Sequence, residues 1–172
     1  SYNRTTASTI TDFTADIRQS SKNISLLTAM IEQNISLGHL KWENRVTFQK
    51  SSDEDILPVP SMNIWTNLYL DFKIAKVLKV HFGADMYWFT SYYAPEYCAQ
   101  LGQYAVQENE AVRTKTGNYP IINAYMNFKL KQCRFFLMMT HVNAGSGNKN
   151  YFLTPHHPQN EMVLRTGLVW TF

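Results

Sequence analysis

The chain has 172 residues, 45% of them hydrophobic and 14% aromatic, and a formal net charge of +3. No stretch reaches the roughly 18 consecutive apolar residues of a membrane-spanning helix, which excludes an α-helical membrane protein. The small positive charge is scattered, without a Lys/Arg run or a nucleic-acid-binding motif, so no nucleic acid partner is expected.

The first forty residues carry the least regular pattern. Residues 9–18 contain a candidate strand, and an outer loop is the alternative reading of residues 1–21. Residues 24–37 alternate between apolar and polar side chains, but they also fit a helical stripe that would end at Gly38. We interpret them as a strand because the next strand begins immediately and needs a hydrogen-bonded neighbour.

From residue 40 onward the alternation is regular, as expected when successive side chains point to opposite faces of a strand. In residues 40–50, apolar side chains form one row, whereas the opposite row is ionic and polar. The same pattern predicts further strands at 63–74, 78–93, 122–130, 134–141 and 162–172. The apolar rows of these six segments contain no Asp, Glu, Lys or Arg, and the opposite rows contain ten.

The connections between these strands alternate in length. The short ones are 36–39, 75–77 and 131–133, and the long ones, rich in Gly, Pro, Asn and Ser, are 51–62, 94–118 and 143–161. Short inner turns and long outer loops are typical of outer-membrane barrels. The fold class that we predict is therefore all-β, an antiparallel up-and-down transmembrane β-barrel with about seven or eight strands in this chain.

Exclusion of charge from one row predicts a lipid-facing surface, because Lys or Arg at the bilayer midplane costs about 2–4 kcal/mol. The residues assigned to this surface and its aromatic girdle are Trp42, Phe48, Leu68, Leu70, Val80, Phe82, Trp88, Tyr92, Phe128, Leu168, Trp170 and Phe172. The opposite row is assigned to the lumen: Lys41, Glu43, Arg45, Gln49, Asp71, Lys73, Lys79, His81, Asp85, Lys129, Arg134 and Arg165. The aromatic residues near strand ends are expected to anchor the chain at the membrane interface.

Residues 1–172 are interpreted as one unit that forms part of a larger barrel. A membrane barrel must close, and seven or eight strands close only a narrow barrel filled by side chains. We therefore expect further strands, from an upstream part of the same protein or from another chain. Because the chain starts at Ser1 without an initiator Met or a signal sequence, we expect a mature or truncated piece.

The charges of the lumen row sum to +4, which suggests a mildly cationic lumen that favours anionic solutes. The alternative is that these groups pair across strands and only fill the interior. Catalysis is not expected: His81 and Asp85 share a face but lie about 13 Å apart along one strand at roughly 3.3 Å per residue. No catalytic residue and no cofactor is assigned.

The remaining chemically active side chains lie in loops and turns. His141, His156 and His157 could bind a metal at the outer rim, but the flanking prolines favour a loop-shaping role, so no metal is assigned. Cys98 and Cys133 are expected to stay unpaired, because an outer loop and an inner turn are separated by a strand spanning about 25 Å.

Several stretches resemble a known family. The last strand resembles the C-terminal recognition strand that the barrel-assembly machinery reads, here ending at Phe172. The segments Trp42–Lys50, Leu101–Tyr104, Asn118–Pro120 and Asn150–Leu153 resemble the putative porin family of Bacteroidota outer membranes. The resemblance covers residues 24 to the end and implies that the chain is the C-terminal segment of a longer protein in the bacterial outer membrane. It implies a presumed pore function and supplies no catalytic residues.

Three functions are consistent with these patterns. The first is a passive porin in outer-membrane lipid, and the second is an accessory barrel packed with other envelope proteins and without an open pore. Liposome swelling separates these two. The third is a soluble ligand-binding barrel with its apolar face inward, which solubility without detergent would reveal. The one-sided long loops and the terminal Phe172 argue against this third function.

Overall fold

The computed structural model describes residues 2–7, 10–15, 21–99, 101–108, 110–146 and 151–171. The described residues form only strands, turns and loops, and none of them lies in a helix long and apolar enough to span a membrane. The strands are β1 (Tyr2–Ala7), β2 (Ile10–Ala15), β3 (Leu26–Leu37), β4 (Leu40–Ser51), β5 (Met62–Ile74), β6 (Leu78–Phe89), β7 (Glu96–Cys98), β8 (Gln103–Ala105), β9 (Ile121–Leu130), β10 (Cys133–Thr140), β11 (Phe152–Thr154), β12 (His157–Pro158) and β13 (Val163–Trp170).

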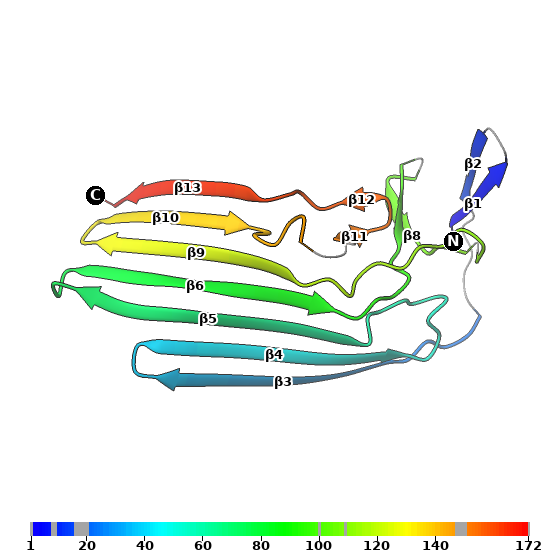
Figure 1. Ribbon diagram of the computed structural model, residues 1–172. Helices are drawn as coiled ribbons and strands as arrows, with labels where there is room; N and C mark the ends of the chain where they lie inside the picture. Colours follow the sequence, from blue (N-terminus) through cyan, green and yellow to red (C-terminus); the bar gives the residue numbers. More distant parts are fainter. Residues whose placement is uncertain are drawn as a thin grey trace.

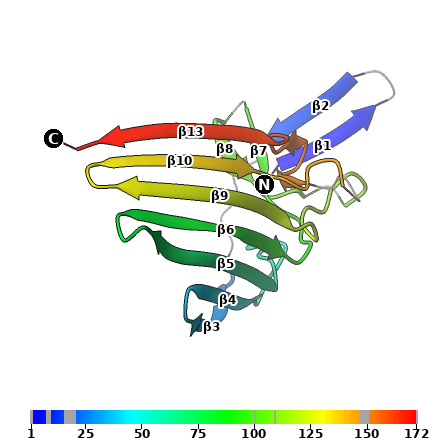
Figure 2. The same ribbon diagram turned by 60° about the vertical axis from the view of Figure 1, so that its left-hand side comes forward.

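Seven long strands form one antiparallel sheet in the order β13-β10-β9-β6-β5-β4-β3, in which chain neighbours are also sheet neighbours (Figure 1). This up-and-down order is that of a barrel wall and confirms the predicted fold class. The sheet twists and curls from β13 to β3 (Figure 2). In the described part of the chain, β3 and β13 each pair with a single long strand, so the sheet is open at both edges.

The cross-strand register gives the sheet two chemically distinct faces. The apolar face carries the odd-numbered residues of β3 and β10 and the even-numbered residues of the other five long strands. On it Leu70 is opposite Leu40 and Phe82, and Phe82 is opposite Met126. Many of these side chains are uncovered: Leu68 is 48% exposed and Leu168 is 65% exposed. The other residues of the seven strands form the polar face.

The turns and loops are segregated as predicted. Short turns join β3 to β4, β5 to β6 and β9 to β10 at one end of the sheet, which we call the turn end (Figure 1). The backbone of these turns adopts positive φ values of 49–61° at Gly38, Ala75, Lys76 and Lys131. The three long loops leave the opposite end, the loop end, where most of the buried apolar side chains gather: Phe89, Ala94, Cys98, Tyr119 and Ile121.

The structure differs from the sequence-based expectations at several strand ends. The strand expected at 78–93 ends at Phe89, because β5 and β9 begin at Met62 and Ile121 and offer no longer partner. Tyr92, expected to continue the apolar row, instead bridges to Thr116. Tyr92 also packs edge-on against Phe89 of the polar face, with ring centroids 5.9 Å apart.

Three small hairpins were not expected. Two lie inside the long loops, where β7 pairs with β8 and β11 pairs with β12. The third pairs β1 with β2. Its second strand falls within the candidate strand 9–18, but its first strand was missed. Residue 9 and residues 16–18 of the candidate strand, and Phe172, lie outside the described residues.

Candidate functional site on the polar face

A hydrogen-bonded row crosses the middle of the polar face. Its members lie directly opposite one another on β4, β5, β6 and β9: Glu43, Asn67, Asp85 and Asn123. Asn67 Nδ2 donates to Glu43 Oε2 at 3.4 Å, and Asn123 Nδ2 donates to Asp85 Oδ2 at 2.8 Å. Each carboxylate of this central row is thus held in place by a neighbouring amide.

Three rings lie next to the central row, on its turn-end side. Tyr69 and Tyr125 are directly opposite Gly83 on the two neighbouring strands. His81 packs against both, with ring centroids 4.5 Å from Tyr69 and 5.5 Å from Tyr125. The two tyrosine hydroxyls donate to oxygens of the central row at 2.8 and 2.7 Å. Gly83 leaves room for these rings, because a Cβ there would lie 2.5 Å from the Cβ of Tyr69.

Two cations predicted for the lumen row have carboxylate partners. Arg45 donates to Glu32 at 2.5 Å, and its guanidinium lies 5.8 Å from the centroid of the Trp65 ring. Lys41 Nζ lies 4.0 Å from Asp71 Oδ2. Because both pairs are substantially exposed, each contributes less than about 1 kcal/mol. They support the cross-strand pairing alternative for this part of the polar face.

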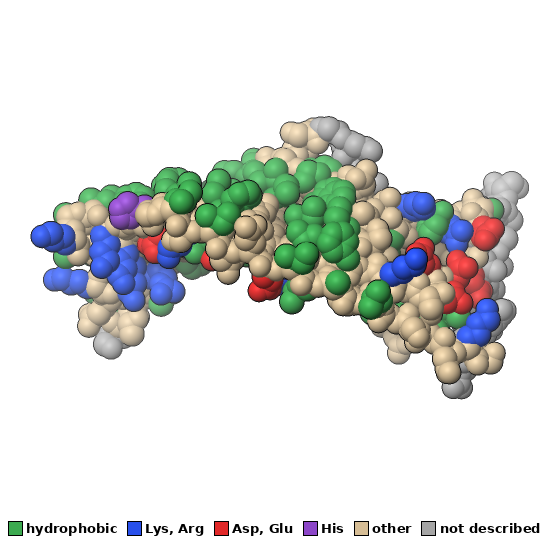
Figure 3. Space-filling view, turned by 90° about the horizontal axis from the view of Figure 1, so that it is seen from below, with side chains coloured by type: hydrophobic (Ala, Val, Ile, Leu, Met, Phe, Trp, Pro, Cys, Tyr) green, Lys and Arg blue, Asp and Glu red, His purple; other side chains and the backbone are tan. Residues whose placement is uncertain are grey.

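Four other predicted lumen cations come together without a carboxylate. Lys73 is directly opposite Lys79, Lys79 is opposite Lys129, and Lys129 is opposite Arg134. All four side chains are exposed, and within the described residues none forms an ion pair. Figure 3 shows Lys and Arg side chains gathered at the turn end of the sheet. We call these four residues the cation row.

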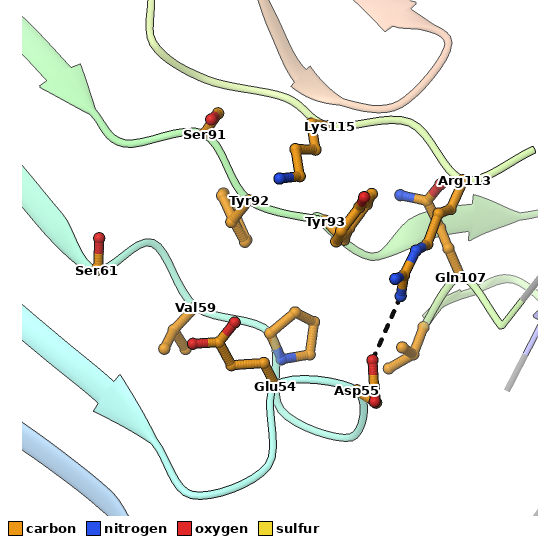
Figure 4. Close-up of a pocket in the computed structure, with 12 residues that line it drawn as sticks. Glu54, Asp55, Val59, Ser61, Ser91, Tyr92, Tyr93, Gln107, Arg113 and Lys115 are labelled. Atoms are coloured by element: carbon orange, nitrogen blue, oxygen red, sulfur yellow. Dashed lines mark hydrogen bonds and ion pairs between the residues drawn. The ribbon is translucent and has the colours of Figure 1, made fainter. Parts of the chain in front are cut away.

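A cavity of about 210 Å³ lies among the long loops at the loop end. Glu54 and Asp55 line one side, and Arg113 and Lys115 line the other, with Tyr93 between them (Figure 4). Arg113 Nη1 lies 3.3 Å from Asp55 Oδ1. The guanidinium of Arg113 lies 4.0 Å, and the ammonium of Lys115 5.0 Å, from the centroid of the Tyr93 ring. The cavity is lined by both polar and apolar side chains and is mixed in charge.

A second cavity, of about 350 Å³, lies where the loop between β10 and β13 folds over the polar face. Its floor includes Asn123 and Arg165, and its roof includes Leu153 and Gln159. The Oε1 atom of Gln159 is buried without a hydrogen-bond partner in the structure. The loop therefore narrows the space above the polar face at the loop end of β9, β10 and β13.

The base of this loop is held by a buried histidine. His141 is 2% exposed, and its ring nitrogens lie 3.0 Å from the Tyr119 hydroxyl and 2.9 Å from the Asn160 carbonyl oxygen. Burial, followed by the nearby Tyr151 hydroxyl, raises the pKa of Tyr119 above its ordinary value. The Tyr119 hydroxyl therefore stays protonated and donates to the Asn143 carbonyl oxygen at 2.9 Å.

The three histidines considered as metal ligands each contact a different partner in the structure. His141 is engaged beneath the loop, His156 Nε2 lies 3.7 Å from Glu96 Oε1, and His157 packs edge-on against Tyr97. Across the described ranges, no three metal-binding side chains gather in one place. Cys98 ends β7 at the loop end, and Cys133 begins β10 at the turn end. No disulfide joins the two.

The residues assigned to the lumen row share the polar face of the sheet, whereas the sequence analysis missed the loop residues that line the two cavities. Gln49 and Arg165 lie on the polar face with the rest of the assigned lumen row, where Gln49 accepts a hydrogen bond from Asn63 at 3.1 Å. Arg113 and Lys115 carry no periodic signal, because the loop that holds them is irregular. The charged stretch from Glu108 to Lys115 was the one available indication.

Comparison with known proteins places these observations in a family. A family model described as "Putative porin" matches residues 2–172, which is nearly the whole chain. No curated protein and no solved structure matches the chain.

Proposed function

We propose a pore function for this chain, which belongs to the "Putative porin" family. The polar face lines a water-filled lumen, and the apolar face contacts the lipid of the bacterial outer membrane. The observation that carries this proposal is the register, which keeps the apolar rows of all seven strands on one face; most of its large side chains are at least partly exposed, whereas Val80 is buried at 4%. A soluble protein rarely exposes so continuous an apolar surface, whereas a barrel wall in lipid requires it.

Closure of the wall needs strands beyond the sheet of β3 to β13. An open edge in hydrocarbon would leave backbone N–H and C=O groups without partners, at several kcal/mol for each group. We therefore propose that another part of the same polypeptide, or another chain, pairs with β3 and β13. In this proposal the chain is the C-terminal segment of a longer Bacteroidota porin, and β13 carries the signal for the barrel-assembly machinery.

The transported solutes are small and hydrophilic, and they cross by passive diffusion. The central row and the tyrosines beside it offer amides, carboxylates and phenols that can replace water around such solutes. The loop between β10 and β13 narrows the lumen at its loop end, which sets an upper limit on solute size.

Liposome swelling tests whether the pore is open. Proteoliposomes that contain the natural protein should swell in isosmotic arabinose faster than protein-free liposomes, and more slowly in a trisaccharide. Heat-denatured protein serves as the control. Equal swelling rates with and without protein would contradict the pore and favour the alternative of an accessory barrel packed within an envelope complex.

Thiol labelling tests which face meets water. Met126 and Asn127 are neighbours in β9 that lie on the apolar and polar faces, respectively. In a background with Cys98 and Cys133 replaced by Ala, Asn127→Cys should react with a membrane-impermeant maleimide in intact proteoliposomes. Met126→Cys should react about tenfold more slowly, because a thiol in hydrocarbon is shielded from water and stays protonated. The reverse order of rates would place the lipid on the polar face.

A further inference from the structure

We propose that the cation row, Lys73, Lys79, Lys129 and Arg134, binds phosphate-bearing anions inside the lumen at the turn end. This proposal rests on the proposed pore, because it assigns a substrate class to the polar face. The row begins one residue from the β5–β6 turn and crosses four adjacent strands, β5, β6, β9 and β10. Neighbouring strands lie about 4.8 Å apart, so the four cations span about 15 Å.

The direct opposition of like charges is unusual, because it destabilises a sheet. The surrounding residues do not neutralise it. The segments 36–41, 71–81, 127–136 and 167–171 of the turn end contain seven Lys or Arg residues and one carboxylate, Asp71. That carboxylate lies 4.0 Å from Lys41, so it is already partnered. Toward the loop end, the acids Glu43 and Asp85 of the central row come next, and Arg45 with its partner Glu32 lies beyond them.

The charges of the polar face are therefore segregated along the strands. Glu43 and Asp85 lie in its middle, whereas the turn end holds the unpaired cations and one acid, Asp71, which is partnered by Lys41. A bound anion would offset the electrostatic repulsion among the four cations. No carboxylate of the described residues pairs with these cations to offset it. The cation row therefore fits an anion-binding surface better than it fits a set of side chains that only pair across strands and fill the interior.

The spacing of the row favours anions with several charged oxygens. A phosphate or pyrophosphate group can contact two or three ammonium groups at once, and the Arg134 guanidinium can bind its oxygens in a bidentate manner. A monovalent anion such as chloride gains less, because it has a single charge to share among the four groups. The position on the polar face favours a solute over a lipid headgroup, which would lie against the apolar face.

Titration of purified, detergent-solubilised protein with inorganic pyrophosphate tests the site without requiring conduction. The double variant Lys79→Gln with Lys129→Gln replaces the two inner members of the cation row, which we call the inner pair. It should weaken pyrophosphate binding by about tenfold, since two of the four attractive charges are removed. The matched control, Lys76→Gln with Lys131→Gln, removes the same charge from the adjacent turns and should weaken binding less than about twofold. The charge-conserving change Lys79→Arg with Lys129→Arg should retain binding.

The proposal would be overturned if the inner-pair variant and the Lys76→Gln with Lys131→Gln control weakened binding equally. Binding would then depend on the net charge of the turn end and not on the cation row. Undetectable pyrophosphate binding by the natural protein would also overturn the proposal. If binding behaves as expected but proteoliposomes do not swell, the anion site stands and the pore proposal fails. If swelling is normal and the inner-pair variant binds pyrophosphate as well as the natural protein does, the pore stands and the anion site fails.

Planar bilayers distinguish a solute from a lipid headgroup as the source of the phosphate. Pyrophosphate added at the turn side should block conductance at the same concentration in bilayers of phosphatidylcholine and in bilayers enriched in phosphatidylglycerol. Block that is lost specifically in the anionic bilayer would show that lipid headgroups occupy the cation row, and the proposal of a solute site would fall.

Discussion

Replacing Val46 with Arg is expected to abolish or strongly reduce insertion of the protein into lipid bilayers. Val46 lies in the middle of β4 on the apolar face, between Ile31 and Ile64 of the neighbouring strands. A charged side chain at this depth in hydrocarbon costs about 2–4 kcal/mol, enough to lower the folded population by more than tenfold. The measurement is the fraction of protein that folds into lipid vesicles across a urea series.

The control is the next residue of the same strand. Thr47 lies on the polar face opposite Asn63, so Thr47→Arg places the same charge in the proposed aqueous lumen. We expect its folded fraction to stay within about 0.5 kcal/mol of the natural protein. If Thr47→Arg were as damaging as Val46→Arg, or more so, the assignment of the apolar face to lipid would be refuted.

Replacing Gly83 with Val is expected to destabilise the sheet between β5 and β6. A Cβ at this position would clash with the Leu68 carbonyl oxygen and would lie 2.5 Å from the Tyr69 Cβ. Because one of these atoms belongs to the backbone, the two strands must move apart, and overpacking of this kind costs about 1–3 kcal/mol. The displaced Tyr69 ring would also lose its contact with His81, so solute permeation should change along with stability.

The neighbouring Ala84 provides the control for this change. Ala84 lies on the opposite, apolar face opposite Leu68, and its side chain is exposed. Ala84→Val introduces the same valine side chain into the same strand, but on the other face. It should leave the urea midpoint of unfolding nearly unchanged. A Gly83→Val protein as stable as the Ala84→Val protein would show that the space above Gly83 is not required by the rings.

Much of the wall was predictable because the signals are local. Alternation with a period of two places neighbouring side chains on opposite faces whatever the partner strand is. That is why the residues around Val46 and Thr47 could be assigned to opposite rows from the sequence. The strand over residues 24–37, where a helix was the alternative, is confirmed as β3. The segregation of short turns from long loops followed from the spacing between alternating segments.

The cation row could not be predicted, because it depends on register. The cation row draws on four strands, and whether its members oppose one another depends on the pairing register, which two short turns set within hairpins and which packing alone sets between β6 and β9. Summing the lumen charges predicted only a mild positive excess spread over the whole face. The tertiary structure instead separates paired cations such as Arg45 from unpaired ones.

The sequence by itself determined which side chains share a face and which end of the sheet carries the long loops, because period and spacing are properties of the local chain. Only the tertiary structure decided which residues oppose each other across strands, where β6 ends, and how the loop after β10 folds over the polar face. These features depend on hydrogen bonding and packing between segments that are distant in the chain, and no local pattern records them.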